Sequence, residues 1–295
     1  MTRFSVVVPH LNSGPALERG LQSLLAQTGV DLQTLVVDGG STDESSETIE
    51  RRREAIDVLI REPDEGYADA LNKGFTRADG EIFGWLPADD ELLPGALAAV
   101  AEVFAAHPDC DVVTGACERV YEDGTRQVCP PDPRAWDKIS VQNVIEQTAT
   151  FWRRELHQRV APLDHRRFPY VADWDLWVRM KEAGARLRTT DRVLSRYHFT
   201  AHNQTSRAGR RFADEAFKLL RLRGPLGGLL AYVYRLLYHH FDLKGCYDSP
   251  PTCAPARRRV FVLVLRTLKV ALGPRLVNMY NWHFAACQER GLKWW

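Results

Sequence analysis

The stretch from Glu81 to Pro94, EIFGWLPADDELLP, contains both an expected core strand and an acidic pair. Its apolar run, 82–86, predicts a buried strand, because unbroken apolarity is typical of strands covered on both faces. The run is followed by two adjacent carboxylates, Asp89 and Asp90. In an open α/β sheet, ligands bind just beyond the carboxyl ends of the strands. The acidic pair therefore indicates a ligand site at a strand tip.

Two interpretations of Asp89 and Asp90 follow from the residues themselves. Hard divalent cations such as Mg²⁺ or Mn²⁺ favour one or two carboxylates together with the phosphates of a substrate. This favours a metal–diphosphate site. The alternative is that one of the two acids caps the helical pattern that starts at Pro94.

Strand and helix patterns alternate on both sides of this stretch. Expected strands cover 4–8, 32–37, 58–60 and 82–86, and expected helices follow them, with Ser41 and Glu44 forming a capping box for the second helix. This alternation of strands and helices predicts an α/β fold with a doubly wound, mostly parallel sheet in residues 1–117. Toward the second part, 118–207, the alternation ends: a strand pair at 111–121 and 126–129 is followed by a strand at 148–152, a helix near 173–180 and a strand at 193–199. Residues 208–295 form a separate helical extension.

The net charge of +1 conceals an uneven distribution. From Ala208 onward the chain carries fifteen Lys and Arg against five Asp and Glu. An acidic body with a basic tail suggests an anionic partner for the tail, and an acidic body makes a nucleic-acid partner a poor fit. The six cysteines show no CxxC pair and no zinc spacing, which fits a cytosolic compartment.

Five stretches taken together resemble the inverting glycosyltransferases of family 2, which have the GT-A nucleotide-sugar fold. These are SVVVP with Asn12 at 5–12, VVDGGSTD at 36–43, EPDEGYADALNKG at 62–74, GEIFGWLPADD at 80–90 and ADWDLW at 172–177. The resemblance covers roughly residues 3–206, and we expect residues 1–207 to form the glycosyltransferase domain. It implies an enzyme that transfers a sugar from a nucleotide-sugar donor.

The resemblance also assigns the donor site. It implies that the first strand tip, with Pro9 and Asn12, and the DGGSTD stretch, with Asp38 and Gly40, hold the nucleotide. A carboxylate such as Asp38 can accept the imide N–H of uracil, although a turn residue ahead of Gly39 and Gly40 is the alternative.

Further donor residues come from the two later stretches. Asp69 and Lys73 match a run that lines the donor pocket in the family, and Lys73 could pair with a phosphate. One of Asp89 and Asp90 is expected to meet the ribose and the other Mg²⁺ or Mn²⁺. Pro87 stands where many relatives have an acidic or amide residue.

The catalytic base is expected at Asp173. The resemblance makes Asp173 the acid of a Glu-Asp pair whose Glu is replaced here by Ala172. Asp175 is a competing candidate, and a helix N-cap is the alternative role of Asp173. His202 lies in a loop that resembles the family's late His-containing segment, where an imidazole can meet the phosphate or the metal.

We therefore expect a metal-assisted, inverting transferase that uses a UDP-sugar and a glycan or lipid-linked glycan acceptor. The alternatives are an inactive nucleotide-sugar-binding module and a sugar nucleotidyltransferase. The latter usually has a Gly-rich basic loop after the first strand, and residues 9–15 contain one Gly and no Lys or Arg.

The last 88 positions, 208–295, combine apolar segments with Arg, Lys and aromatic residues. Such helices can lie in the interface of an anionic membrane. The expected location is thus the cytoplasm, with peripheral attachment to the inner face of the cytoplasmic membrane. Packing on the acidic body or in a homodimer is the alternative. No uncharged apolar run reaches the length of about 18 residues that spans a bilayer.

Overall fold

The structure is a computed structural model, and it describes residues 1–140, 143–200, 203, 210–221 and the single positions 256, 259, 260, 263 and 267. The chain divides into two compact units. One contains residues 1–135 and 145–207, and the other contains residues 136–144 and 208–295.

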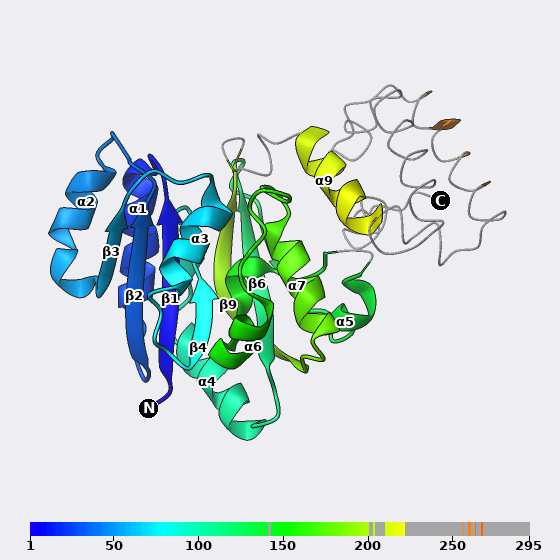
Figure 1. The fold of residues 1–295 in the computed structure, drawn as a ribbon, viewed down its shortest axis with the longest axis horizontal. Coiled ribbons are helices and arrows are strands. Elements are labelled where there is room, and N and C mark those ends of the chain that lie inside the picture. The colour runs from blue at the N-terminus through cyan, green and yellow to red at the C-terminus, as the bar shows by residue number, and fades with distance from the viewer. Residues whose placement is uncertain are drawn as a thin grey trace. The chain divides into compact units, whose positions relative to one another are not determined.

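The first unit is built on a mixed sheet (Figure 1). Within the described residues the strand order is β3-β2-β1-β4-β8-β6-β9-β5, with β7 paired to β6. The strands are β1 (Arg3–His10), β2 (Asp31–Asp38), β3 (Val58–Arg61), β4 (Ile82–Trp85), β5 (Glu91–Leu92), β6 (Val112–Tyr121), β7 (Arg126–Cys129), β8 (Thr150–Arg153) and β9 (Leu187–Phe199).

The strand directions decide where a site can form. Strands β3, β2, β1 and β4 are mutually parallel, and β8 is antiparallel to both β4 and β6. Strand β6 therefore runs in the same direction as β4, and β9 is parallel to β6. Six strands thus end at one edge of the sheet, which we call the carboxyl edge. Ligands of open α/β sheets bind beyond this edge.

Alternating side chains of β1 pack against different helices on the two faces of the sheet. Phe4, Val6 and Val8 share a core with α1 (Gly14–Leu25), α2 (Ser45–Arg51) and α4 (Ala96–Ala106). On the other face, Val7 lies against Gly74 of α3 (Tyr67–Phe75), where an added Cβ would be 2.4 Å from a Val7 methyl group. Helices α6 (Arg154–Val160) and α7 (Ala172–Glu182) join α3 on this face through the aromatic cluster described below. The remaining short elements are α5 (Ala135–Lys138), η1 (Arg53–Ala55) and η2 (Gln147–Ala149).

The structure confirms the α/β class and the mostly parallel sheet. The expected capping box was wrong, because α2 begins at Ser45 with Glu44 at its N-cap. The expected last strand, 193–199, begins earlier, at Leu187, and the two-residue strand β5 was not predicted. Both β5 and the first half of β9 are defined by pairing with distant strands, which the local pattern does not show.

The second unit contains α9 (Arg210–Arg221). Ala216 and Leu219 on this helix are buried, while Arg211 and Lys218 are exposed. Among the described residues, no helix is both long and apolar enough to cross a membrane. Most of the expected apolar segments of 222–295 lie outside the described residues, so the expected membrane attachment stays a prediction.

A buried aromatic cluster ties the helices of one face to the strands. The Trp85 ring, at the end of β4, stacks on Trp177 of α7 with 5.4 Å between centroids and meets Trp152 of β8 edge-on at 5.0 Å. Phe75 of α3 lies 4.5 Å from the His157 ring of α6. Aromatic pairs at these separations add about 0.5–1.5 kcal/mol each beyond the area that they bury. The cluster therefore fixes α3, α6 and α7 relative to β4.

His157 makes this cluster sensitive to acid. Burial, aided by the nearby positive charge of Arg179, lowers the pKa of His157 from 6.5 to about 4, and Trp152 Nε1 donates to its Nδ1 over 3.3 Å. Below pH 6.5 the unfolded chain takes up a proton that the folded chain accepts only near pH 4. The free energy of unfolding should therefore fall across this window, by about 3 kcal/mol in total at 1.36 kcal/mol per pKa unit.

His157→Gln keeps an acceptor for Trp152 but does not titrate. We expect denaturant unfolding at pH 7, 6, 5 and 4 to show a shallower loss of stability for this variant than for the native chain. Parallel pH profiles for the two proteins would contradict the buried neutral imidazole.

Candidate active site

Three polar side chains stand in a row across the carboxyl ends of β1, β2 and β3. His10, Asp38 and Arg61 occupy matched register positions on these neighbouring parallel strands. The Asp38 carboxylate lies between the other two, with His10 Nε2 3.7 Å from Oδ1 and Arg61 Nε 3.8 Å from Oδ2. Sequence reasoning singled out Asp38 alone, because the register that adds His10 and Arg61 is set by strand pairing.

Asp38 is buried and remains ionised. Burial, the largest influence, raises the pKa of Asp38, but hydrogen bonds from Ser41 and Gly40 and the proximity of His10 outweigh it and lower the pKa below its ordinary value. The backbone N–H groups of Ser41 and Gly40 donate to Oδ1 over 2.8 and 3.1 Å. The predicted turn role is therefore present, and it uses one carboxylate oxygen.

The loops after β1 and β2 are joined to one another. The Asn12 backbone N–H donates to Ser41 Oγ over 2.9 Å, and Asn12 Oδ1 accepts the Thr42 N–H over 2.8 Å. Gly40 has a φ of +96°, a conformation that favours glycine. Pro9 is buried within β1. Pro9, Asn12 and Gly40 therefore belong to the strand end and loops around Asp38, and their contact with a nucleotide stays a prediction.

Asp89 and Asp90 occupy the turn between β4 and β5. The helix-cap alternative does not hold, because α4 begins at Ala96 with Gly95 at its N-cap. Asp89 Oδ2 accepts the Asn203 side-chain N–H over 2.8 Å, and Asp90 Oδ1 accepts the His198 backbone N–H over 3.0 Å. Asn203 and His198 belong to the segment that follows or ends β9, so the turn lies against the end of that strand.

The buried charge of this pair is incompletely compensated. Burial and then the charge of Asp89 raise the pKa of Asp90 well above its ordinary value, and burial raises the pKa of Asp89. Asp90 Oδ2 is buried and has no hydrogen-bond partner within the part of the chain that the structure describes. A buried carboxylate oxygen without a partner, next to a second acid, fits a divalent cation. The described residues contain no group of three His, Cys, Asp or Glu side chains that could hold a metal by themselves.

Neighbouring charges hold the acidic turn in place. Arg19 of α1 donates to the Asp89 carbonyl oxygen over 3.1 Å and pairs with Glu91 at 3.4 Å. Glu91 also accepts from His198 Nε2 over 2.7 Å and pairs with Arg196 at 3.4 Å. Glu91 thus connects α1, β5 and β9 beside the acidic pair, a role that no local sequence signal revealed.

Lys73 is held by protein groups. Its Nζ donates to the Pro63 carbonyl oxygen over 2.7 Å and lies 3.1 Å from Glu62 and 3.4 Å from Asp69. Asp69 Oδ2 also accepts the Glu65 N–H over 3.0 Å. An ammonium group has three N–H donors, and these three neighbours can use them all. Lys73 and Asp69 therefore order the 62–66 loop, and a phosphate contact by Lys73 stays a prediction.

Asp173 lies in the first turn of α7, beyond the N-cap residue Val171. It precedes Trp177 by four residues, and side chains at this spacing share a helix face. Because Trp177 stacks on Trp85, the face that carries Asp173 is directed to the strand that leads into Asp89 and Asp90. The competing Asp175 is buried and paired with Arg179 at 2.8 Å.

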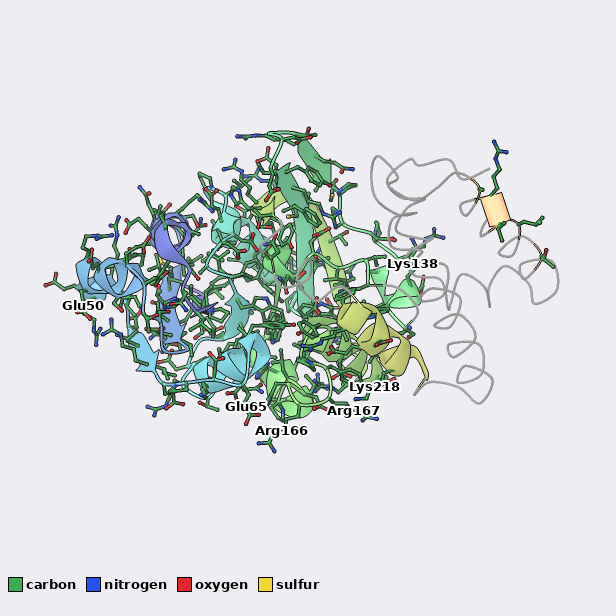
Figure 2. The ribbon with its side chains drawn as sticks, turned by 90° about the horizontal axis from the view of Figure 1, so that it is seen from above. Glu50, Glu65, Lys138, Arg166, Arg167 and Lys218 are labelled. Carbon is green, nitrogen blue, oxygen red and sulfur yellow. The ribbon has the colours of Figure 1, made fainter. Side chains whose placement is uncertain are left out.

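Asn72 of α3 fixes the loop that leads into α7. Its Nδ2 donates to the Leu163 carbonyl oxygen over 2.9 Å, and its Oδ1 accepts the Leu163 N–H over 2.8 Å. Nearby, Glu65 accepts from His165 over 3.2 Å and from Arg166 over 3.4 Å. Figure 2 shows Glu65 and Arg166 at the surface. The donor-side loop and the loop before Asp173 are thereby joined. His202, the remaining predicted metal ligand, lies outside the described residues.

Comparison with known proteins gives a family. The sequence model described as Glycosyl transferase family 2 matches residues 5–157. An uncharacterised glycosyltransferase of Nostoc sp. is 30% identical over 190 residues, which cover 59% of this chain and 56% of that protein. A PGL/p-HBAD biosynthesis glycosyltransferase of Mycobacterium bovis is 30% identical over 186 residues, which cover 60% of this chain and 68% of that protein. The alignment thus leaves more than two fifths of the Nostoc protein uncovered.

Solved structures share the fold at lower identity. TarS of S. aureus, crystallised with UDP-GlcNAc, matches with a TM-score of 0.56 at 17% identity over 98% of this chain and 92% of its own. The mannosyltransferase PcManGT of Pyrobaculum calidifontis, in complex with GDP-Man and Mn²⁺, matches with a TM-score of 0.59 at 21% identity. The match covers 99% of this chain and 86% of that protein. Both likenesses support the GT-A architecture.

Gly20 of α1 allows the acidic turn to approach the helix. A Cβ at this position would lie 2.8 Å from the Ala88 carbonyl oxygen and 3.1 Å from that of Asp90. We expect Gly20→Ala to displace the turn and to lower the free energy of unfolding by about 1–3 kcal/mol, the usual cost of overpacking.

The control is Gln22→Ala, at an exposed position of the same helix. Denaturant unfolding checks the difference between the two variants. A Gly20→Ala protein stabilised by the higher helix propensity of alanine, about 1 kcal/mol, would contradict this tight contact.

Asp90→Asn tests the uncompensated charge. A carboxyl whose pKa is raised on folding destabilises the folded chain at neutral pH, and this cost disappears as the pH falls. In metal-free buffer at pH 7 the variant should therefore melt higher, with about 2–4 °C for each kcal/mol gained. Adding Mn²⁺ should raise the melting temperature of the native chain but leave that of Asp90→Asn unchanged. A lower melting temperature for the metal-free variant would show that the charge is already compensated.

Proposed function

Because the chain belongs to glycosyl transferase family 2, we propose that it transfers a sugar from a nucleotide-sugar, a UDP-sugar, to a hydroxyl group of a glycan or lipid-linked glycan. The observation that carries the proposal is the gathering of Asp38 and the Asp89–Asp90 turn at one sheet edge, with α7 packed beside β4. This edge is where open α/β sheets bind ligands.

The donor is held by groups from separate strands. Asp38 Oδ2 accepts the imide N–H of the base, since Oδ1 already binds the loop backbone. Asp89 is half-buried and accepts a hydrogen bond from a ribose hydroxyl. Asp90, whose buried Oδ2 has no partner among the described residues, would hold Mg²⁺ or Mn²⁺ beside the donor phosphates. When bound, such a cation neutralises the charge of the departing diphosphate.

Asp173 is the general base of a single displacement. Its carboxylate removes the proton of the acceptor hydroxyl while the hydroxyl oxygen bonds to the anomeric carbon. The bond from that carbon to the diphosphate oxygen breaks, its electron pair leaves with the nucleoside diphosphate, and the anomeric configuration inverts. Positioned proton transfer of this kind contributes about 10²–10⁴-fold to the rate.

The assay separates binding from chemistry. UDP release from a panel of UDP-sugars, with water or a supplied glycan as acceptor, gives turnover, and calorimetry with UDP and Mn²⁺ gives affinity. We expect Asp173→Asn to lower turnover by about 10²–10⁴-fold with unchanged UDP affinity, and Asp89→Ala to lose UDP binding.

Asp175→Asn is the matched control for the base. Asp175 is bound to Arg179, so its variant should lose thermal stability but keep turnover within a few-fold. Equal losses of turnover in both variants would overturn the assignment of Asp173. UDP binding without turnover for any sugar or acceptor would instead support the alternative of an inactive binding module.

A further inference from the structure

The polar row at the ends of β1, β2 and β3 has a defined pattern of donors and acceptors. Asp38 is paired in register with Arg61 on one side and His10 on the other. Because equivalent positions of neighbouring parallel strands direct their side chains to the same face, the three groups face the same space. The carboxylate accepts and the guanidinium donates.

The two oxygens of Asp38 are not equivalent. Oδ1 accepts the Gly40 and Ser41 N–H groups and lies 3.7 Å from His10 Nε2. Oδ2 faces Arg61 Nε at 3.8 Å, a separation that leaves room for a further donor. The carboxylate therefore offers one oxygen, and not two, to a ligand.

Arg61 remains accessible beside that oxygen. Its side chain is 40% exposed, and its Nη1 is 2.8 Å from Glu50 of α2, whose side chain is itself 60% exposed. Figure 2 shows Glu50 on the outer side of α2. Among the described contacts of Arg61, Nη2 has no acceptor, so the guanidinium can donate to a ligand without leaving Glu50 or Asp38.

One accepting oxygen next to a donor matches the imide edge of uracil or thymine, where an N–H lies between two carbonyl groups. Cytosine and adenine present a ring nitrogen acceptor where Asp38 requires a donor. Guanine presents an N–H and a carbonyl, but its adjacent amino group would face the already occupied Oδ1. A buried donor left without an acceptor costs about 1–3 kcal/mol, which corresponds to about 5–150-fold in affinity.

We propose that Arg61 is a specificity-determining residue that reads, together with Asp38, the imide edge of a uracil or thymine base in the donor. Arg61 donates to a carbonyl group that flanks the imide N–H bound by Asp38. This inference rests on the proposed function, which takes the donor as a UDP-sugar, and it adds Arg61 as the residue that selects the base together with Asp38.

The test uses calorimetry with Mn²⁺ and five ligands, UDP, dTDP, GDP, 2-thio-UDP and 4-thio-UDP. The native chain should bind UDP at least about tenfold more tightly than GDP. Sulfur is a weaker acceptor than oxygen, so one of the two thio analogues should bind several-fold more weakly than UDP. In Arg61→Met, which keeps an apolar side chain of similar length, UDP affinity should fall about tenfold and the penalty of that analogue should disappear.

Glu50→Gln is the control, because it removes the ion pair between Glu50 and Arg61 but leaves the N–H donors of the Arg61 guanidinium in place. This variant should retain both the UDP affinity, within about twofold, and the thio penalty. The dTDP titration shows whether the site separates thymidine from uridine nucleotides, and equal binding of both still supports recognition of the imide edge.

Two results would overturn the inference while leaving the proposed function intact. The first is a loss of affinity on thio substitution that is the same in the native chain and in Arg61→Met, or that is absent from both. The second is GDP binding as tight as that of UDP. If no nucleoside diphosphate binds the native chain, the proposed donor site itself fails, and this outcome is distinct from the other two.

Discussion

The stacking of Trp85 on Trp177 is the contact on which the arrangement of the site depends. Trp85 ends the strand that leads into the acidic turn, and Trp177 lies one helical turn after Asp173. A contact between two indole rings thus relates the expected donor side to the expected base. Trp152 completes the contact from β8, the strand at which the sheet changes from parallel to antiparallel.

The acidic turn shows the usual conflict between stability and function. Asp90 is fully buried, and among the described residues its Oδ2 has no hydrogen-bond partner, which is unusual for a core position. The surrounding charged groups do not remove this cost. Arg196 pairs with Glu118 at 2.6 Å and with Glu91 at 3.4 Å, and Arg19 pairs with Glu91 and reaches the turn only through the Asp89 carbonyl oxygen. The chain therefore keeps a locally unfavourable charge at the place where a cationic ligand would compensate it.

Local sequence patterns were sufficient for the elements of the parallel half. The apolar runs at 4–8 and 32–37 gave strands within two residues of their ends, because buried parallel strands are marked by their own composition. Pairing over long distances was not visible, so β5 and the start of β9 were missed. Ser41 illustrates the same limit, since its side chain accepts from Asn12 of another loop and does not cap α2. The family resemblance indicated Asp38, Asp89, Asp90 and Asp173, but only the strand register placed His10 and Arg61 beside Asp38.

The two hydrogen bonds between Asn72 and the Leu163 backbone affect which positions of the sequence can change during evolution. Asn72 binds both main-chain groups of Leu163, the carbonyl oxygen and the N–H, and its Nδ2 also lies 3.5 Å from His165 Nδ1. The anchoring through Leu163 is therefore independent of the side chain at position 163. Residues between α6 and α7 can drift in evolution while the path of the loop into α7 is preserved. A lineage can thus remodel this part of its surface without rebuilding the parallel half of the sheet.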